Sequence, residues 1–166
     1  PDPATFKSWE DVLEAYAEQV KFFTSKIEAL ERINNELLAQ YAPRPFYSAL
    51  LDGCIEQGKD CRRWVYNSLL HHFSQVIGGT NVADAITAIK KIVFEDRKVT
   101  LPELITIMDK NWAGREDVRL ACLNAPKFGN DDDYADEIAR IVQTRGEAAM
   151  EEVKDRFGHS HRGDGS

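Results

Sequence analysis

The sequence has no long hydrophobic run and no cluster of positive charge, and each of these absences excludes a class of protein. None of its apolar stretches approaches the ~20 residues that a membrane-spanning helix requires. Its 28 acidic and 21 basic residues give a net charge of −7. Binding to nucleic-acid phosphates needs clustered Lys and Arg, so this charge argues against such a partner. We therefore expect neither a membrane nor a nucleic acid among its partners.

Cysteine is also scarce, and the chain has only Cys54, Cys61 and Cys122. An odd number at irregular spacing does not make a disulfide framework, and no Cys-x-x-Cys pair indicates a zinc or iron–sulfur site. Glycine loops that bind phosphate and Ser/His/Asp arrangements are absent as well. We expect reduced thiols, a cytoplasmic location and no metal site.

Helical periodicity is what the sequence has in abundance. Its 43% hydrophobic and 30% charged residues are ordinary for a globular protein. Ser8 with Asp11 indicates a shortened capping box, and Thr100 with Glu103 indicates a full one, with Pro102 in the first turn. We predict a mainly α fold with at most one or two short strands. The expected helices cover residues 9–40, 46–58, 82–95, 101–110, 116–123 and 131–156.

The stretch 123–136 reads as a helix, a stop and a restart. Pro126 ends the first helix, Gly129 breaks it, and Asn130 is predicted to cap the next one. The first turn of that helix then holds a run of acidic residues, where the helix dipole favours them. Calcium binding is the alternative, but the run lacks the spacing of a calcium loop. The acidic residues are Asp131, Asp132, Asp133 and Asp136.

Several segments, in this order, resemble the glycyl radical enzymes, the pyruvate formate-lyase-like family. They cover residues 44–50, 52–60, 66–67, 81–86, 88–95, 111–119 and 123–136. The resemblance implies a ten-stranded α/β barrel wrapped in helices, of which this chain is a helical segment. It also implies anaerobic lyase, dehydratase, decarboxylase or fumarate-adding chemistry on a small organic substrate. In that family an activating enzyme with S-adenosylmethionine and an iron–sulfur cluster installs a glycyl radical, and the full-length enzyme is expected to be a homodimer.

The resemblance places residues 1–166 in the central part of that domain, with 159–166 as a flexible tail. The cysteine loop and the C-terminal glycyl radical domain are expected to lie outside the chain, which would then hold no catalytic residue and be inactive alone. Cys54 and Glu56 superficially resemble the Gly-Cys-x-Glu loop. Residues two apart on a helix point in different directions, so we predict that Cys54 is a packed helix residue.

The candidates for the substrate cavity are Tyr66, Asn67, His71 and Phe73. Periodicity over 64–77 suits either a short helix or a buried strand. The resemblance favours a short strand at 65–69, since this region supplies a barrel strand in the family. His71 and His72 are adjacent, so at most one of them can face a given pocket. Arg63-Trp64-Val65 replaces a glycine pair common before the Tyr-Asn, which puts a diol dehydratase or amine lyase assignment in doubt.

A free-standing interaction module is the competing interpretation, and it depends on the helix 9–40. A polar Asn34 on its apolar seam is the kind of residue that sets the register of a coiled-coil dimer. Val12, Phe22 and Ile33 widen the apolar face, which favours a long helix packed on a larger body. The seam residues are Leu13, Tyr16, Val20, Phe23, Ile27, Leu30, Leu37 and Tyr41.

Overall fold

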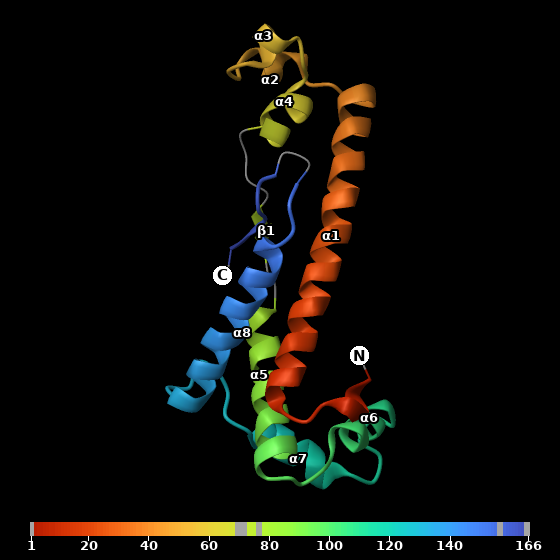
Figure 1. Cartoon of the computed structure of the whole chain (residues 1–166), viewed down its shortest axis with the longest axis vertical. Helices are drawn as coiled ribbons and strands as arrows, with labels where there is room; N and C mark the ends of the chain where they lie inside the picture. The colour runs from red at the N-terminus through yellow and green to blue at the C-terminus, as the bar shows by residue number, and fades with distance from the viewer. Residues whose placement is uncertain (1, 69–72, 76–77, 156–157, 165–166) are drawn as a thin grey trace. The chain divides into compact units, whose positions relative to one another are not determined.

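Helices make up most of the computed structural model, which describes residues 2–68, 73–75, 78–155 and 158–164 (Figure 1). The helical elements are η1 (Pro3–Thr5), α1 (Trp9–Tyr41), α2 (Pro45–Ala49), α3 (Cys54–Gln57), α4 (Cys61–Ser68), α5 (Gly79–Ile89), the π-helix η2 (Lys90–Glu95), α6 (Leu101–Asp109), α7 (Glu116–Asn124) and α8 (Asp133–Glu151). The strands are β1 (Phe73–Gln75) and β2 (Arg162–Asp164). Among the residues described, the prediction of a mainly α fold with at most one or two short strands is confirmed.

The chain divides into two compact units. The first unit comprises Pro1–Glu18, Val76–Gly146 and Gly165–Ser166, and the second comprises Gln19–Gln75 and Glu147–Asp164. Two helices, α1 and α8, contribute residues to both units.

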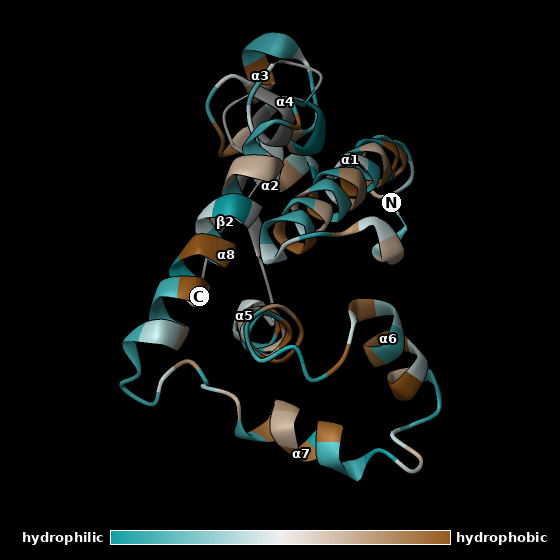
Figure 2. Cartoon of the chain, turned by 60° about the horizontal axis from the view of Figure 1, so that its bottom comes forward, coloured by the Kyte–Doolittle hydropathy of each residue, from teal (hydrophilic) through white to brown (hydrophobic). Residues whose placement is uncertain are grey.

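The first unit contains two hydrophobic clusters. One joins η2, α6 and α7 through Ile92, Leu104, Ile107 and Val118, together with neighbouring apolar residues. The other joins the start of α1, α5 and α8 through Leu13, Ala83, Ile86, Ile138 and Val142. Figure 2 shows hydrophobic residues on α6 and α7 interrupted by polar ones, as amphipathic helices require.

Two of the predicted helix starts are present. The Thr100 hydroxyl accepts a hydrogen bond from Glu103 N, and the Glu103 carboxylate accepts one from Thr100 N at 2.8 Å, with Pro102 in the first turn. At α1, Asp11 Oδ2 accepts from Ser8 N at 3.0 Å. Local sequence is sufficient to predict both helix starts because the donors and acceptors lie within one helical turn.

The helix predicted over 82–95 changes its winding. It is α-helical as far as Ile89 and then π-helical from Lys90 to Glu95. Asp96 N donates to Lys91 O, five residues earlier, at 2.8 Å. The adjacent residues Ile92 and Val93 of this π-helix are both buried.

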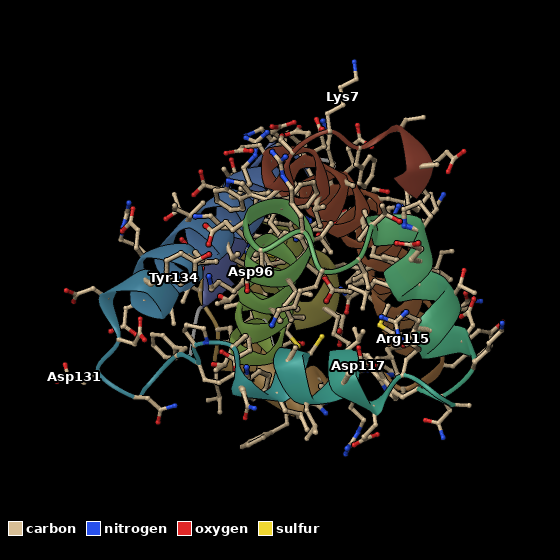
Figure 3. All side chains as sticks on the ribbon, turned by 90° about the horizontal axis from the view of Figure 1, so that it is seen from below. Lys7, Asp96, Arg115, Asp117, Asp131 and Tyr134 are labelled. Carbon is tan, nitrogen blue, oxygen red and sulfur yellow. The ribbon has the colours of Figure 1, made fainter. Side chains whose placement is uncertain are left out.

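The prediction that Asn130 caps the last helix is wrong. Asp132 is the cap, since its Oδ1 accepts from Tyr134 N at 3.0 Å and from Ala135 N at 3.4 Å. Asp131 has a positive φ of 56°, so it lies in a turn before the helix rather than in its first turn. Figure 3 shows Asp131 at the periphery, on the loop that leads into α8. Asp133 and Asp136 do occupy the first turn.

In the second unit the helix predicted over 46–58 is interrupted. It forms two short helices, α2 and α3, separated by Gly53 with φ 84°. Gly58, with φ 58°, ends α3. Left-handed backbone favours glycine, so these two residues set the ends of α3.

The two strands also lie in the second unit and pair in parallel, with Phe73 opposite Arg162 and Gln75 opposite Asp164. His161 N donates to Val153 O at 3.2 Å, and the His161 side chain is buried. The segment 159–166, predicted as a flexible tail, therefore carries a paired strand and a buried histidine as far as Asp164.

Candidate functional site

The predicted cavity residues fall on α4 and β1. Tyr66 and Asn67 belong to α4, so the predicted strand at 65–69 is wrong for 65–68, which are helical. Phe73 begins β1. His71 lies outside the described residues, as do the side chains of Tyr66, Asn67 and Phe73. Their convergence on one substrate cavity stays a prediction, and what the structure describes is how α4 is held.

Asp60 fixes the start of α4. Its Oδ1 accepts from Arg62 N at 3.0 Å, and its Oδ2 accepts from Arg44 N at 2.7 Å. Ser48 Oγ lies 3.3 Å from Asp60 Oδ2 and accepts from Cys61 N at 2.9 Å. Burial alone would raise the pKa of Asp60, but the donors from Arg44, Arg62 and Ser48 together hold this pKa below its ordinary value.

Arg62 and Arg63 attach α4 to α1. Arg62 Nη1 donates to Leu38 O at 3.1 Å and to Ala42 O at 2.7 Å, and the side chain is buried. Both carbonyls lie at the C-terminal end of α1, where a cation is favourable. Leu38 O also accepts from Ala42 N at 2.9 Å, whereas Ala42 follows the last residue of α1. Arg63 Nε forms an ion pair with Glu36 Oε2 at 3.0 Å on the surface.

Trp64 attaches α4 to the turn before α3. Its Nε1 donates to Asp52 O at 3.2 Å. A Cβ placed on Gly53 would lie 2.1 Å from that same Nε1, so the indole occupies the space that any side chain at Gly53 would need. Lys59 Nζ lies 5.4 Å from the centroid of the indole ring, within the range of a cation–π interaction.

Cys54 and Cys61 are both buried, with 2% and 1% of their surface exposed. Burial, followed by the nearby Cys61 and Asp60, raises the pKa of the Cys54 thiol. A thiol that stays protonated is a poor nucleophile, which agrees with the prediction that Cys54 is a packed helix residue. An open pocket of about 290 Å³ lies beside it, lined mostly by apolar atoms of Pro43, Pro45, Ser48, Ala49, Cys54, Ile55, Gly58, Lys59 and Asp60.

Within the described ranges, no three His, Cys, Asp or Glu side chains are grouped as a metal site would require. No described helix is long and apolar enough to cross a bilayer. The anchors Ser48, Asp60 and Arg62 were not singled out by sequence reasoning. Asp60 carried a usable signal, because an Asp directly before a helix is a common cap.

Comparison with known proteins identifies the family. A family model described as "Pyruvate formate lyase-like" matches residues 1–163. Over 142 residues the chain is 37% identical to isethionate sulfite-lyase of Nitratidesulfovibrio vulgaris, covering 85% of this chain and 17% of that protein. Over 145 residues it is 39% identical to trans-4-hydroxy-L-proline dehydratase of Clostridioides difficile, covering 85% of this chain and 18% of that protein.

Solved structures agree with these relatives. The glycerol-bound glycerol dehydratase of Clostridium butyricum superposes with a TM-score of 0.83 at 28% identity, over 98% of this chain and 21% of that one. Hydroxyproline dehydratase of Clostridioides difficile superposes with a TM-score of 0.80 at 32% identity, over 99% of this chain and 21% of that one. The predicted fold class, a helical part of a glycyl radical enzyme barrel, is confirmed. The chain therefore belongs to the pyruvate formate lyase-like family, the glycyl radical enzymes, and spans less than a quarter of the length of these relatives.

Proposed function

We propose that this chain is an internal segment of a glycyl radical enzyme, in which it supplies scaffold and part of the substrate cavity. The observation that carries the proposal is the match of residues 1–163 to one family, together with superposition of nearly the whole chain on about a fifth of a solved dehydratase. The cavity part would be α4 and β1, with Tyr66, Asn67, His71 and Phe73 as the candidate residues.

The described glycines of this chain are poorly suited to hold the radical. Gly146 lies inside α8, where a Cβ would meet the Tyr16 hydroxyl at 2.8 Å, and Gly158 has φ 87° in the turn before β2. The residues that flank Gly146 and Gly158 in sequence do not match the family's C-terminal glycyl loop. We propose that the radical glycine and its partner cysteine belong to the remainder of the protein. When formed, the radical would supply hydrogen abstraction from the substrate by way of that cysteine.

An exposed apolar face of α1 supports the proposal that this segment packs on other parts of a larger protein. On α1 within the second unit, Phe23 is 59% exposed and Leu30 is 66% exposed. Isolated exposed apolar residues are ordinary, but a continuous row on one helix marks an interface. The exposed large residues of this α1 face are Phe22, Phe23, Ile27, Leu30, Ile33, Leu37 and Tyr41.

The names of the relatives support a proposal for the substrate class. The relatives' names describe a sulfite-lyase acting on isethionate and dehydratases acting on trans-4-hydroxy-L-proline and glycerol. We propose a small organic substrate of this kind, radical installation by an S-adenosylmethionine iron–sulfur activating enzyme, an anaerobic homodimer, and a cytoplasmic location.

Anaerobic activation of the full-length protein tests the proposal. The expected result is a glycyl radical doublet in electron paramagnetic resonance, followed by turnover in a screen of isethionate, trans-4-hydroxy-L-proline and glycerol. A reading frame without a Gly-Cys-x-Glu loop upstream and a glycyl loop downstream would exclude it.

The same exposed face of α1 favours the second candidate, a free-standing helical interaction module. It requires that the polypeptide 1–166 form a single cooperative dimer through that helix. Analytical ultracentrifugation of the isolated polypeptide distinguishes the two, because a monodisperse dimer with one melting transition supports the module.

A further inference from the structure

We propose that Trp64 is a positioning residue, which locks α4 onto Gly53 and thereby fixes the part of the α4 backbone that carries the proposed cavity residues Tyr66 and Asn67. This inference rests on the proposed function, and it names a residue that acts through others rather than on substrate.

The contact between Trp64 and Gly53 is closer than any other residue type at position 53 would permit. A Cβ on Gly53 would lie 2.1 Å from Trp64 Nε1, 2.8 Å from Cε2 and 3.1 Å from Cζ2. The indole N–H donates to Asp52 O at 3.2 Å, in the same turn. Close approach of the indole to the Gly53 backbone and one directional hydrogen bond therefore fix the position of the indole.

Helix geometry passes this constraint to the cavity residues. The hydrogen-bonded backbone of an α-helix is regular over one turn, so holding it at one position also holds the backbone two and three positions later. Trp64 precedes Tyr66 and Asn67 by those intervals on α4. Arg62 is held independently by Leu38 O of α1 and by Ala42 O directly after α1, so α4 is attached to different partners at Arg62 and at Trp64.

Gly53→Ala and Gly58→Ala form a matched pair that tests the contact in the full-length enzyme. Both glycines have positive φ, 84° and 58°, and both border α3, so alanine introduces backbone strain at each. Only Gly53 faces Trp64, whereas nothing lies within 4 Å of a Cβ on Gly58. The difference between the two variants therefore reports the displaced indole rather than the strain.

Two measurements are made on each variant, with Trp64→Gly and Trp64→Phe alongside. The first is amide hydrogen exchange of residues 61–68 without substrate. The second is KM and kcat, normalised to radical spins, for whichever of isethionate, trans-4-hydroxy-L-proline or glycerol the activated wild-type enzyme turns over.

We expect Gly53→Ala and Trp64→Gly to speed exchange in 61–68 and raise KM about tenfold, with a smaller change in kcat per radical, because misplaced cavity residues weaken substrate orientation. Trp64→Phe keeps a ring and should recover part of the loss. In the Trp64→Gly background, Gly53→Ala should cost no more than Gly58→Ala, because the indole is no longer there to displace.

Equal effects of Gly53→Ala and Gly58→Ala on exchange would overturn the inference. So would a loss of radical yield with KM unchanged, which is the signature of a merely structural role. Absence of a glycyl radical in the wild-type enzyme would instead overturn the proposed function, and the exchange measurement would still decide how α4 is held.

Discussion

At the scale of single residues, the carboxylate of Asp60 connects several parts of the second unit by hydrogen bonds. It accepts from backbone groups of Arg44 and Arg62 and lies within hydrogen-bond reach of Ser48. Arg44 precedes α2 and Arg62 lies in α4, so this one side chain connects the elements on either side of α3. Hydrogen bonds to a charged acceptor are stronger than those between neutral groups, which makes Asp60 the main polar junction of this region.

Asp60→Asn should lower the melting temperature at neutral pH by about 2–4 °C, the shift expected for the loss of a helix cap worth about 1 kcal/mol at this chain length. An amide offers one acceptor oxygen, whereas the donors use both oxygens of Asp60. Circular dichroism of the thermal unfolding of wild type and variant measures the shift.

The contribution of Asp60 to stability changes with pH in a definite direction. The folded pKa of Asp60 lies below its ordinary value of 3.8, so its contribution to stability is fully present above that value and is lost as the pH falls through the folded pKa. The melting curves of wild type and Asp60→Asn should therefore converge under acid. A gap between them that stays constant down to about pH 2 would contradict this.

At the scale of elements, α8 meets the start of α1 closely in the first unit. Ile138 and Val142 pack with Leu13, and Arg145 pairs with Glu14. Gly146 allows the Tyr16 ring to approach the helix, because a Cβ there would lie 2.8 Å from the Tyr16 hydroxyl and 3.5 Å from the ring carbons. A glycine in a helix interior is unfavourable by about 1 kcal/mol relative to alanine, so this approach has a cost that the packing offsets.

Gly146→Ala should therefore be nearly neutral in the wild-type background and stabilising by about 1 kcal/mol in a Tyr16→Phe background. Removing the hydroxyl leaves only the ring carbons, which are at ordinary contact distance from a new Cβ. Urea unfolding of the four proteins of the double-mutant cycle measures the coupling. Equal effects of Gly146→Ala in the two backgrounds would show that the hydroxyl does not crowd that position.

At the scale of the whole molecule, the exposed face of α1 distinguishes a packed segment from an independent domain. Hydrophobic and hydrophilic residues alternate around α1 (Figure 2), yet the large apolar residues of the face from Phe22 to Tyr41 named above are exposed in the chain as described. The relatives are about five times longer, since the chain covers only 17% and 18% of two of them. We expect the remainder of such a protein to cover this face.

Phe23→Glu combined with Leu30→Glu should have opposite effects in the two contexts. In the isolated polypeptide 1–166, these charges should reduce the binding of an apolar dye and the aggregation, with helicity retained. In the full-length enzyme they should lower the melting temperature, since burying an unpaired carboxylate costs several kcal/mol. Glu18→Gln on the same helix is a charge-changing control outside this face. An improved or unchanged stability of the full-length enzyme would show that the face is not covered there.

The sequence by itself determined the features whose partners lie within a helical turn or whose periodicity runs long. These include α1, predicted over 9–40 and found as Trp9–Tyr41, and the capping box of Thr100 and Glu103. The resemblance also gives Tyr66, Asn67, His71 and Phe73 as candidates for the substrate cavity, and their role stays a prediction.

Only the tertiary structure decided what depends on residues distant in sequence. The break between α2 and α3 accompanies the approach of Trp64 to Gly53. The start of α4 is held by the bond of Asp60 to Arg44 N and by the bonds of Arg62 to carbonyls at the end of α1. The cap of α8 is Asp132 rather than the predicted Asn130, because the positive φ of Asp131 delays the helix start. Periodicity reports which residues are apolar, but the choice between helix and strand over 65–68 depended on contacts that no local pattern contains.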